Sequence, residues 1–205
     1  MLTSVRHDQA LEGSVSGSPR LVIVGGPNGA GKTTLARRLV VEYGLLYLGA
    51  DEIAAEMGLG ATGAGPVHAG RTFIERVNAA IERRESAIVE STLSGLGSGR
   101  LIRRFRGAGY EVIIEQVYVA SAEECVARIR GRVLRGGHHV PEQDVRRRFT
   151  RSIRNFWERY RLEVDRWRLH YNGMAGPVLV IEGQGREALV IDPRLFESFL
   201  ALLEE

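Results

Sequence analysis

The most informative stretch of this chain is Gly25-Gly26-Pro27-Asn28-Gly29-Ala30-Gly31-Lys32-Thr33-Thr34. Its residues 26–33 match the pattern G-x-x-x-x-G-K-[ST], in which glycines allow backbone amides to turn inward around phosphate oxygens. Residues 21–24 before the pattern are apolar and predict a strand, and residues 34–43 after it have helical spacing. The order of strand, loop and helix is the setting that a phosphate-binding loop requires, so we expect a nucleotide here.

Lys32 is the only lysine among the 28 basic residues. A compact ammonium on a slim stem can enter the loop and reach the β- and γ-phosphates, whereas a planar guanidinium is wider and favours fork-like pairing. Guanine-specific proteins usually read the base with N-K-x-D, which is impossible when the only lysine lies in the loop. We therefore expect ATP, with Mg²⁺ held by the Thr33 hydroxyl. The expected ATP contacts are Gly26, Pro27, Asn28, Gly29, Ala30, Gly31, Lys32, Thr33 and Thr34.

The length of 205 residues fits one domain. Residues 1–19 are rich in Ser, Gly and charged residues and lack the apolar core of a signal peptide, so they predict a disordered tail before a single domain over residues 20–205. The chain has no run of 18 apolar residues, and its single cysteine, Cys125, cannot form an internal disulfide. These features favour a cytoplasmic protein that does not use a membrane as its partner.

Strand and helix patterns alternate along the chain, which predicts a parallel sheet covered on both faces. The fold class expected is therefore α/β, a three-layer sandwich of the P-loop NTPase and kinase type, with a mainly parallel sheet in the order 2-3-1-4-5. The expected strands are residues 21–24, 45–48, 87–89, 111–119, 178–181 and 188–191. The expected helices are residues 34–43, 66–84 and 101–107, two helices after residues 121 and 141, and one from residue 193 onward.

Asp51 distinguishes among the proteins that use a phosphate loop. It follows Lys32 after room for only one helix and one strand, whereas motor-type ATPases usually place their acidic residue much further along. This position matches small-molecule kinases, in which an aspartate at the carboxyl edge of the sheet accepts the proton of the substrate hydroxyl. The other interpretation is an N-cap for the helix that would follow, since Asp favours that position.

Glu90, Ser91 and Thr92 end the third expected strand, next to a glycine-rich loop. Three polar side chains at this place suit a substrate hydroxyl or a water on Mg²⁺. The alternative is a turn whose hydroxyls bond their own backbone.

Residues 128–168 hold 13 arginines and five acids, a local net charge of +8. Arg128, Arg132 and Arg135 share one helical face, and "RGGHHVP" separates them from a second basic helix. Two such helices joined by glycines predict an arginine-rich lid over about residues 128–154, which would stabilise the charge that develops in phosphoryl transfer. We expect Arg132, Arg147 and Arg148 to contact phosphate, and most of the other arginines to lie on a solvated face.

The paired histidines, the cysteine and the two tryptophans are expected to have structural roles. His138 and His139 are adjacent and point in different directions, so they are expected to be loop residues and not a zinc site. Cys125 is expected to pack in the core, as are Trp157 and Trp167.

Several motifs together resemble the zeta toxin family of kinases over residues 21–173. They are "GGPNGAGKTT", "ADEIA", "HAGR", "ESTLSG", R-I-x-x-R-V at Arg128–Val133, "GGHHVP", and "RRRF" followed by "DRW" and "YN". Better-studied toxins carry I-D-x-D where this chain has Leu48-Gly49-Ala50-Asp51, so it resembles a shorter, compact branch.

The resemblance implies an ATP-dependent kinase that phosphorylates a sugar hydroxyl of UDP-N-acetylglucosamine. It implies that Lys32 binds phosphates, that Asp51 is the base, and that arginines of residues 128–148 lie over the γ-phosphate. It also places Arg71, Glu90 and Thr92 beside the substrate, and implies a small helical antitoxin as a partner.

Two other functions remain open at this point. The first is a kinase of the same build that acts on another hydroxyl, such as a nucleoside or a nucleic-acid end. The arginine faces carry no interleaved aromatic residues for stacking bases, so nucleic acid is not the expected partner. The second is a nucleotide-gated binding protein, which would bind ATP without transferring phosphate.

Overall fold

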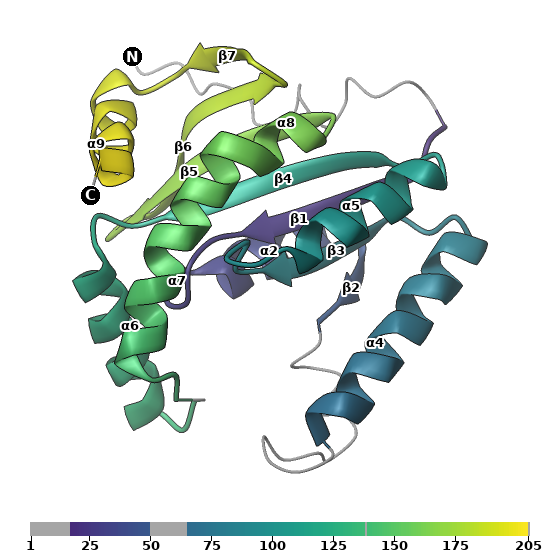
Figure 1. The fold of residues 1–205 in the computed structure, drawn as a ribbon, viewed down its shortest axis with the longest axis horizontal. Coiled ribbons are helices and arrows are strands. Elements are labelled where there is room, and N and C mark those ends of the chain that lie inside the picture. Colours follow the sequence, from purple (N-terminus) through teal and green to yellow (C-terminus); the bar gives the residue numbers. More distant parts are fainter. Residues whose placement is uncertain (1–16, 50–64, 138, 205) are drawn as a thin grey trace.

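The sheet is the centre of the molecule in the computed structural model, which describes residues 17–49, 65–137 and 139–204 (Figure 1). In the part of the chain described, seven strands lie in the order β2-β3-β1-β4-β5-β6-β7. The strands are β1 (Arg20–Gly25), β2 (Leu46–Leu48), β3 (Ala87–Ser91), β4 (Glu111–Tyr118), β5 (Arg166–Gly173), β6 (Gly176–Gln184) and β7 (Glu187–Val190). The helices are α2 (Lys32–Tyr43), α4 (Gly65–Glu82), α5 (Gly97–Gly107), α6 (Ala122–Leu134), α7 (Glu142–Asn155), the π-helix η1 (Phe156–Tyr160), α8 (Arg161–Glu163) and α9 (Pro193–Glu204).

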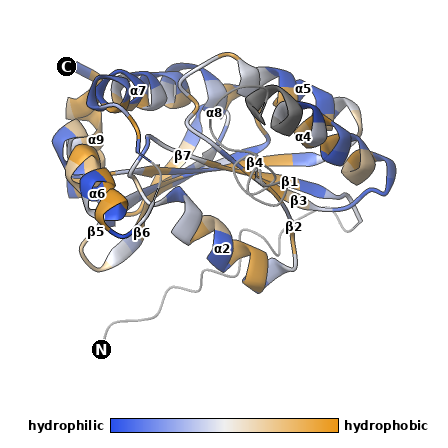
Figure 2. Cartoon of the chain, turned by 90° about the horizontal axis from the view of Figure 1, so that it is seen from below, coloured by the Kyte–Doolittle hydropathy of each residue, from blue (hydrophilic) through white to orange (hydrophobic). Residues whose placement is uncertain are grey.

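The first five strands are parallel, and β6 and β7 extend the sheet as an antiparallel hairpin. The predicted α/β sandwich and the order 2-3-1-4-5 of its parallel strands are confirmed, although a different segment fills the fifth position. Figure 2 shows α2 on one face of the sheet and α4, α5 and α7 on the other. Parallel strands of this kind are buried on both faces, and β1 accordingly reads as the apolar run Leu21–Val24, which is almost completely buried.

The strand beside β4 is not the one that the sequence analysis expected. The expected fifth strand, residues 178–181, lies within β6, and the fifth parallel strand is β5 at Arg166–Gly173, where no strand was predicted. Its apolar residues alternate with charged ones, so Trp167 and Leu169 are buried in the core while Arg168 faces the other side. Arg168 forms an ion pair with Glu115 of β4 at 3.0 Å, which explains how a charged residue can lie in an inner strand.

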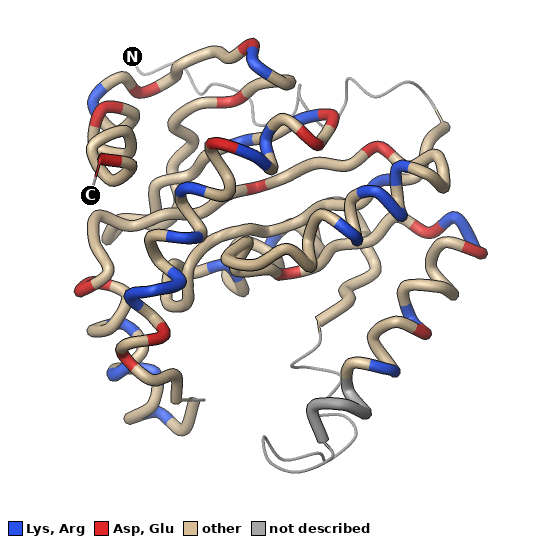
Figure 3. Tube along the Cα trace, in the orientation of Figure 1, with Lys and Arg blue, Asp and Glu red and all other residues tan. Residues whose placement is uncertain are grey.

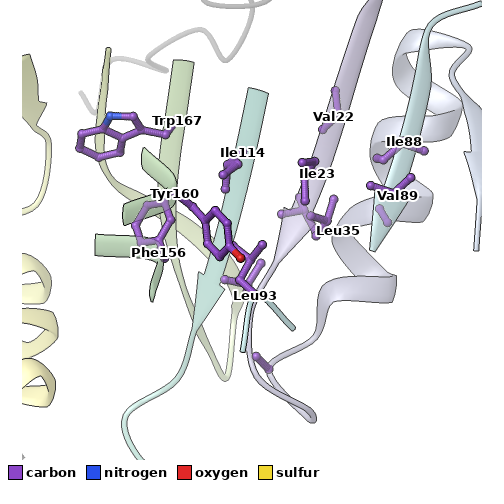
Figure 4. Packing of buried hydrophobic residues seen from close by; sticks show 14 of the residues in the cluster. Val22, Ile23, Leu35, Ile88, Val89, Leu93, Ile114, Phe156, Tyr160 and Trp167 are labelled. Carbon is purple, nitrogen blue, oxygen red and sulfur yellow. The ribbon is translucent and has the colours of Figure 1, made fainter. Parts of the chain in front are cut away.

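The core on the α7 side is rich in aromatic residues (Figure 4). Trp167 of β5 packs edge-on against Phe156 of η1, with ring centroids 5.9 Å apart, and Phe199 of α9 closes the cluster. Trp157 packs against the same cluster, and Cys125 is fully buried, so the packing predicted for both tryptophans and for the cysteine is confirmed. Large T-shaped aromatic contacts of this kind fix β5 against the helical layer.

Two helix boundaries follow from local sequence signals. α2 ends at Gly44, which adopts the left-handed conformation with φ 62°. α6 begins at Ser121, whose hydroxyl accepts a hydrogen bond from the Glu124 amide at 3.2 Å. The predicted capping residue is therefore in place, although the Glu124 carboxylate accepts from the Ala120 amide instead of from Ser121.

The predicted tail of residues 1–19 lies mostly outside the described residues, and β1 begins directly after it. The described helices include none that is both long enough and apolar enough to cross a membrane.

Candidate active site

The loop of residues 26–31 connects β1 to α2 at the carboxyl edge of the sheet. No side chain caps the first turn of α2 and no acidic residue lies in it, so its backbone amides and the positive end of its dipole remain available to an anion. Gly29 has φ 85°, and a Cβ there would lie 2.7 Å from the Cys125 carbonyl oxygen. A side chain at residue 29 would therefore push the loop off the start of α6.

Lys32 and Thr33, the last two residues of the motif, both line the space above the loop. The Lys32 ammonium donates to the Pro27 carbonyl at 2.9 Å, so the side chain folds back across the loop that it follows. The Thr33 hydroxyl donates to Glu90 Oε2 at 2.9 Å, and Tyr47 donates to Glu90 Oε1 at 2.6 Å.

Glu90 lies beside the loop because β3 pairs with β1, with Val24 opposite Glu90 and Gly25 opposite Ser91. A threonine hydroxyl next to a carboxylate is an oxygen donor set of the kind that Mg²⁺ prefers, so these residues fit the ion that the motif implies. At the end of this strand the Ser91 hydroxyl accepts a hydrogen bond from the Leu93 amide at 3.1 Å, which is the turn given as the alternative in the sequence analysis. Contact of these side chains with a substrate hydroxyl or a metal-bound water stays a prediction. Tyr47, which holds the carboxylate from β2, was not identified from the sequence.

A cavity of about 510 Å³ opens above the loop. Its walls come from the loop and α2, the end of β3, one face of α6, and the end of β5. The lining residues are Asn28, Gly29, Gly31, Lys32, Thr33, Thr34, Glu90, Ser91, Thr92, Arg128, Ile129, Arg132, Arg135 and Asn172. The structure thus brings most of the expected nucleotide contacts together with Glu90, Thr92 and Arg132.

Figure 3 shows basic residues along both α6 and α7. Arg128 and Arg132 of α6 and Arg135 just after it line the cavity, whereas Arg147 and Arg148 of α7 do not. Arg147 forms an exposed ion pair with Asp144 at 2.6 Å. Arg148 lies nearer, with a guanidinium nitrogen 3.4 Å from the Asn28 side-chain oxygen at the rim of the loop.

Of the other expected site residues, Arg71 lies outside the cavity, whereas Thr92 is part of its wall. Arg71 is exposed on α4 and is not among the cavity residues, and the Thr92 hydroxyl bonds that of Ser94 at 2.7 Å. Asp51, the expected base, lies outside the described residues, as does His138. His139 is exposed in the connection between α6 and α7.

Asn172 at the end of β5 is a site residue that sequence reasoning missed. Its side-chain amide donates to the Ala30 carbonyl at 2.7 Å, and its own carbonyl accepts from Arg128 at 2.7 Å. It thereby ties the phosphate loop to β5 and α6. The alternation of apolar and polar residues over residues 166–172 is the signal that could have placed it.

Most of the remaining arginine block is neutralised by ion pairs instead of facing the cavity. The pairs are Arg130–Glu142, Arg146–Glu123, Arg159–Glu163, Arg166–Glu111 and Arg168–Glu115. Cys125 lies behind the loop, and burial raises the pKa of its thiol to about 12 although Lys32 and Arg128 act in the opposite direction. It therefore stays protonated and packs as a small apolar side chain.

Three solved structures share the fold over most of this chain. A putative kinase from Chloroflexus aurantiacus has a TM-score of 0.56 and 23% identity, covering 66% of this chain and 80% of its own. A complex of AvrRxo1-ORF1 and -ORF2 with ATP has a TM-score of 0.65 and 18% identity, covering 90% and 64%. The PezAT chromosomal toxin–antitoxin system of Streptococcus pneumoniae has a TM-score of 0.62 and 16% identity, covering 93% and 88%. The architecture is thus the α/β fold of P-loop kinases.

At the level of sequence, a protein of Haemophilus influenzae described as uncharacterized is 30% identical over 124 residues, which are 60% of this chain and 88% of the relative. A family model described as an AAA domain matches residues 21–155, from β1 through the phosphate loop and both arginine-bearing helices. The chain therefore belongs to this AAA domain family, AAA_33.

Proposed function

We propose that this protein is an ATP-dependent kinase that transfers the γ-phosphate to a hydroxyl of a small molecule. The observation that carries the proposal is the cavity itself, where Lys32 and the Thr33–Glu90 pair face three arginines of α6. Phosphoryl transfer needs positioning and positive charge around the γ-phosphate more than it needs covalent chemistry from the protein. Both requirements are met by groups on separate, rigid elements.

Each group has a defined task in this reaction. The loop amides, the α2 terminus and Lys32 bind the β- and γ-phosphates. Thr33 and Glu90 would hold Mg²⁺, and the ion would neutralise phosphate charge. The acceptor oxygen attacks the γ-phosphorus, its proton passes to the Asp51 carboxylate, and ADP leaves. Arg132 stabilises the negative charge on the transferred oxygens.

The acceptor that we propose is a sugar nucleotide, with UDP-N-acetylglucosamine as the first candidate. Arg128 and Arg135 are seven residues apart on α6, so their Cα atoms are separated by about 10 Å along the helix axis. The loop approaches α6 at Cys125, in the first half of the helix, so Arg135 at the end of the helix lies farther from the loop than Arg128, which bonds Asn172. A guanidinium at that distance suits a phosphate that belongs to the acceptor.

The likeness to a toxin–antitoxin system also supports a proposal about partners. One of the structures with this fold is described as part of such a system, and the zeta toxin motifs occur in this sequence. We therefore propose that a small antitoxin inhibits this kinase.

The function is tested by incubating the protein with Mg-ATP and a panel of acceptors, and identifying products by mass. UDP-N-acetylglucosamine is expected to gain one phosphate, and free N-acetylglucosamine much less. Arg135→Ala is expected to raise the KM for the sugar nucleotide while leaving the KM for the free sugar unchanged. Equal use of both acceptors by the wild type would refute the sugar-nucleotide assignment.

Tight ATP binding without any product would instead favour a nucleotide-gated binding protein. The panel should therefore include nucleosides and RNA ends, because product from these alone would reassign the acceptor but keep the kinase chemistry.

A further inference from the structure

Leu93 is held in an unusual backbone conformation directly after the polar end of β3. Its φ is 51°, in the left-handed region that residues with a Cβ rarely adopt, and its side chain is buried with 1% exposure. The side chain packs on the start of the phosphate loop, since a Cβ on Gly25 would lie 2.6 Å from Leu93 Cδ1. A strained, buried residue at this place persists only when its surroundings hold it.

Besides the Ser91 hydroxyl, which accepts from the Leu93 amide at 3.1 Å, the contacts that hold this turn come from the end of α7 and from η1. The Asn155 side-chain amide donates to the Leu93 carbonyl at 2.8 Å, and the Tyr160 hydroxyl donates to the Gly95 carbonyl. Figure 4 shows the Tyr160 hydroxyl pointing toward Leu93. Tyr160 is fully buried, so its hydroxyl has no competing water.

The π-helix explains how two residues five apart can reach the same turn. In an α-helix, side chains at i and i+5 are about 140° apart around the axis. In η1 the Arg161 amide bonds the Phe156 carbonyl, the i to i+5 pattern of a π-helix, which turns less per residue and so reduces that separation. Asn155 and Tyr160 therefore face the turn together, which a regular α-helix would prevent.

Helix α7 is also linked to the phosphate loop, indirectly through Gln116 and directly through Arg148. Gln116 of β4 donates to the buried Ser152 hydroxyl of α7 at 3.3 Å, and its side-chain oxygen lies against Gly25. Near its other end, Arg148 approaches Asn28. The phosphate loop and the segment after β3 are thus both linked to α7.

We propose that Asn155 and Tyr160 are positioning residues that hold the segment 91–96, and with it Glu90 and Thr92, in the geometry that the transfer reaction needs. The inference rests on the proposed kinase function, which it deepens. Neither residue lines the cavity, so both act through the backbone of this segment. Displacement of reacting groups by about 1 Å can lower a rate about a hundredfold, so distant anchors of this kind can control kcat.

The test compares Tyr160→Phe with Tyr110→Phe. Each variant removes one buried hydroxyl that bonds a backbone carbonyl, but Tyr110 bonds Ala80 and Glu85 at the opposite end of the sheet. We expect Tyr160→Phe to lower kcat at least tenfold and to leave the Kd for ATP within about threefold, whereas Tyr110→Phe keeps full activity. Asn155→Ala is expected to behave like Tyr160→Phe. Equal activity of the two phenylalanine variants would overturn the inference.

A second readout does not depend on turnover. Amide hydrogen exchange of residues 92–96 is expected to accelerate at least tenfold in Tyr160→Phe and Asn155→Ala, and to stay unchanged in Tyr110→Phe. Unchanged protection of these amides in all variants would refute the positioning role. If the wild type transfers no phosphate to any acceptor, the proposed function fails, and the exchange result still decides whether these residues hold the segment.

Discussion

Replacement of Gly31 by alanine tests how the phosphate loop is fixed to the rest of the fold. Gly31 precedes α2 with φ 97°, in the left-handed region, where a residue with a Cβ pays about 1–2 kcal/mol. A Cβ at this position would also lie 2.2 Å from the Asn172 side-chain nitrogen. The Asn172 amide must then leave the Ala30 carbonyl, to which it donates at 2.7 Å, and loss of that hydrogen bond costs about 1 kcal/mol.

Together these effects predict that Gly31→Ala lowers the free energy of unfolding by about 2–3 kcal/mol. The same substitution in an Asn172→Ala background meets no amide, so only the backbone cost of about 1–2 kcal/mol remains. The two substitutions should therefore be coupled by about 1 kcal/mol in a double-mutant cycle.

Urea unfolding followed by tryptophan fluorescence measures all four proteins, since Trp167 is fully buried and Trp157 packs beside it. Nucleotide affinity, measured in parallel with a fluorescent ATP analogue, should fall in both proteins that carry Gly31→Ala. If Gly31→Ala costs the same in the two backgrounds, then Asn172 does not press against the loop, and the link between β5 and the phosphate loop is refuted.

Three further predictions follow from other contacts. Lys32→Arg should lose ATP affinity at least tenfold by fluorescence titration, because a guanidinium is too wide for the loop; unchanged affinity would show that any cation suffices. Glu90→Gln should raise the Mg²⁺ concentration required for half-maximal ATP binding by about tenfold, whereas an unchanged requirement would remove the carboxylate from the metal site. Burial alone would raise the pKa of Glu115, but the hydrogen bond and charge of His170 and the charge of Arg168 hold it below its usual 4.5, so the unfolded state binds more protons in acid. The free energy of unfolding should therefore fall as the pH drops below about 4.5. Glu115→Gln should make it depend less on pH in this range, and should lower it by about 3–5 kcal/mol at pH 7. If the variant loses stability in acid as steeply as the wild type does, this prediction is wrong.

The parts of the fold that sequence predicted well have local signals. The apolar run of β1, the glycine pattern and the helical spacing after it occupy adjacent positions, so one stretch determines strand, loop and helix. β5 was missed because its charged residues resembled a continuation of the arginine block. Its ion pairs with Glu111 and Glu115 come from a strand about fifty residues earlier, and no local pattern contains them.

The choice of cavity arginines shows a second limit. Helical periodicity predicts which residues share a face, and Arg128, Arg132 and Arg135 do share the face that lines the cavity. Periodicity does not predict whether the basic face of α6 or that of α7 points toward the cavity. Tertiary packing of α6 against the phosphate loop decides this, so Arg147 on the second helix pairs with Asp144 instead.

The most direct test of the kinase assignment follows the γ-phosphate itself. Wild-type protein and Asp51→Asn are incubated with Mg-ATP labelled at the γ-phosphate and with UDP-N-acetylglucosamine, and labelled product is counted alongside ATP affinity. We expect stoichiometric transfer of label to the acceptor by the wild type, and loss of transfer with nearly unchanged ATP affinity in Asp51→Asn. Equal transfer by both proteins would contradict the role of Asp51, and ATP binding without transfer to any hydroxyl acceptor would contradict the kinase itself.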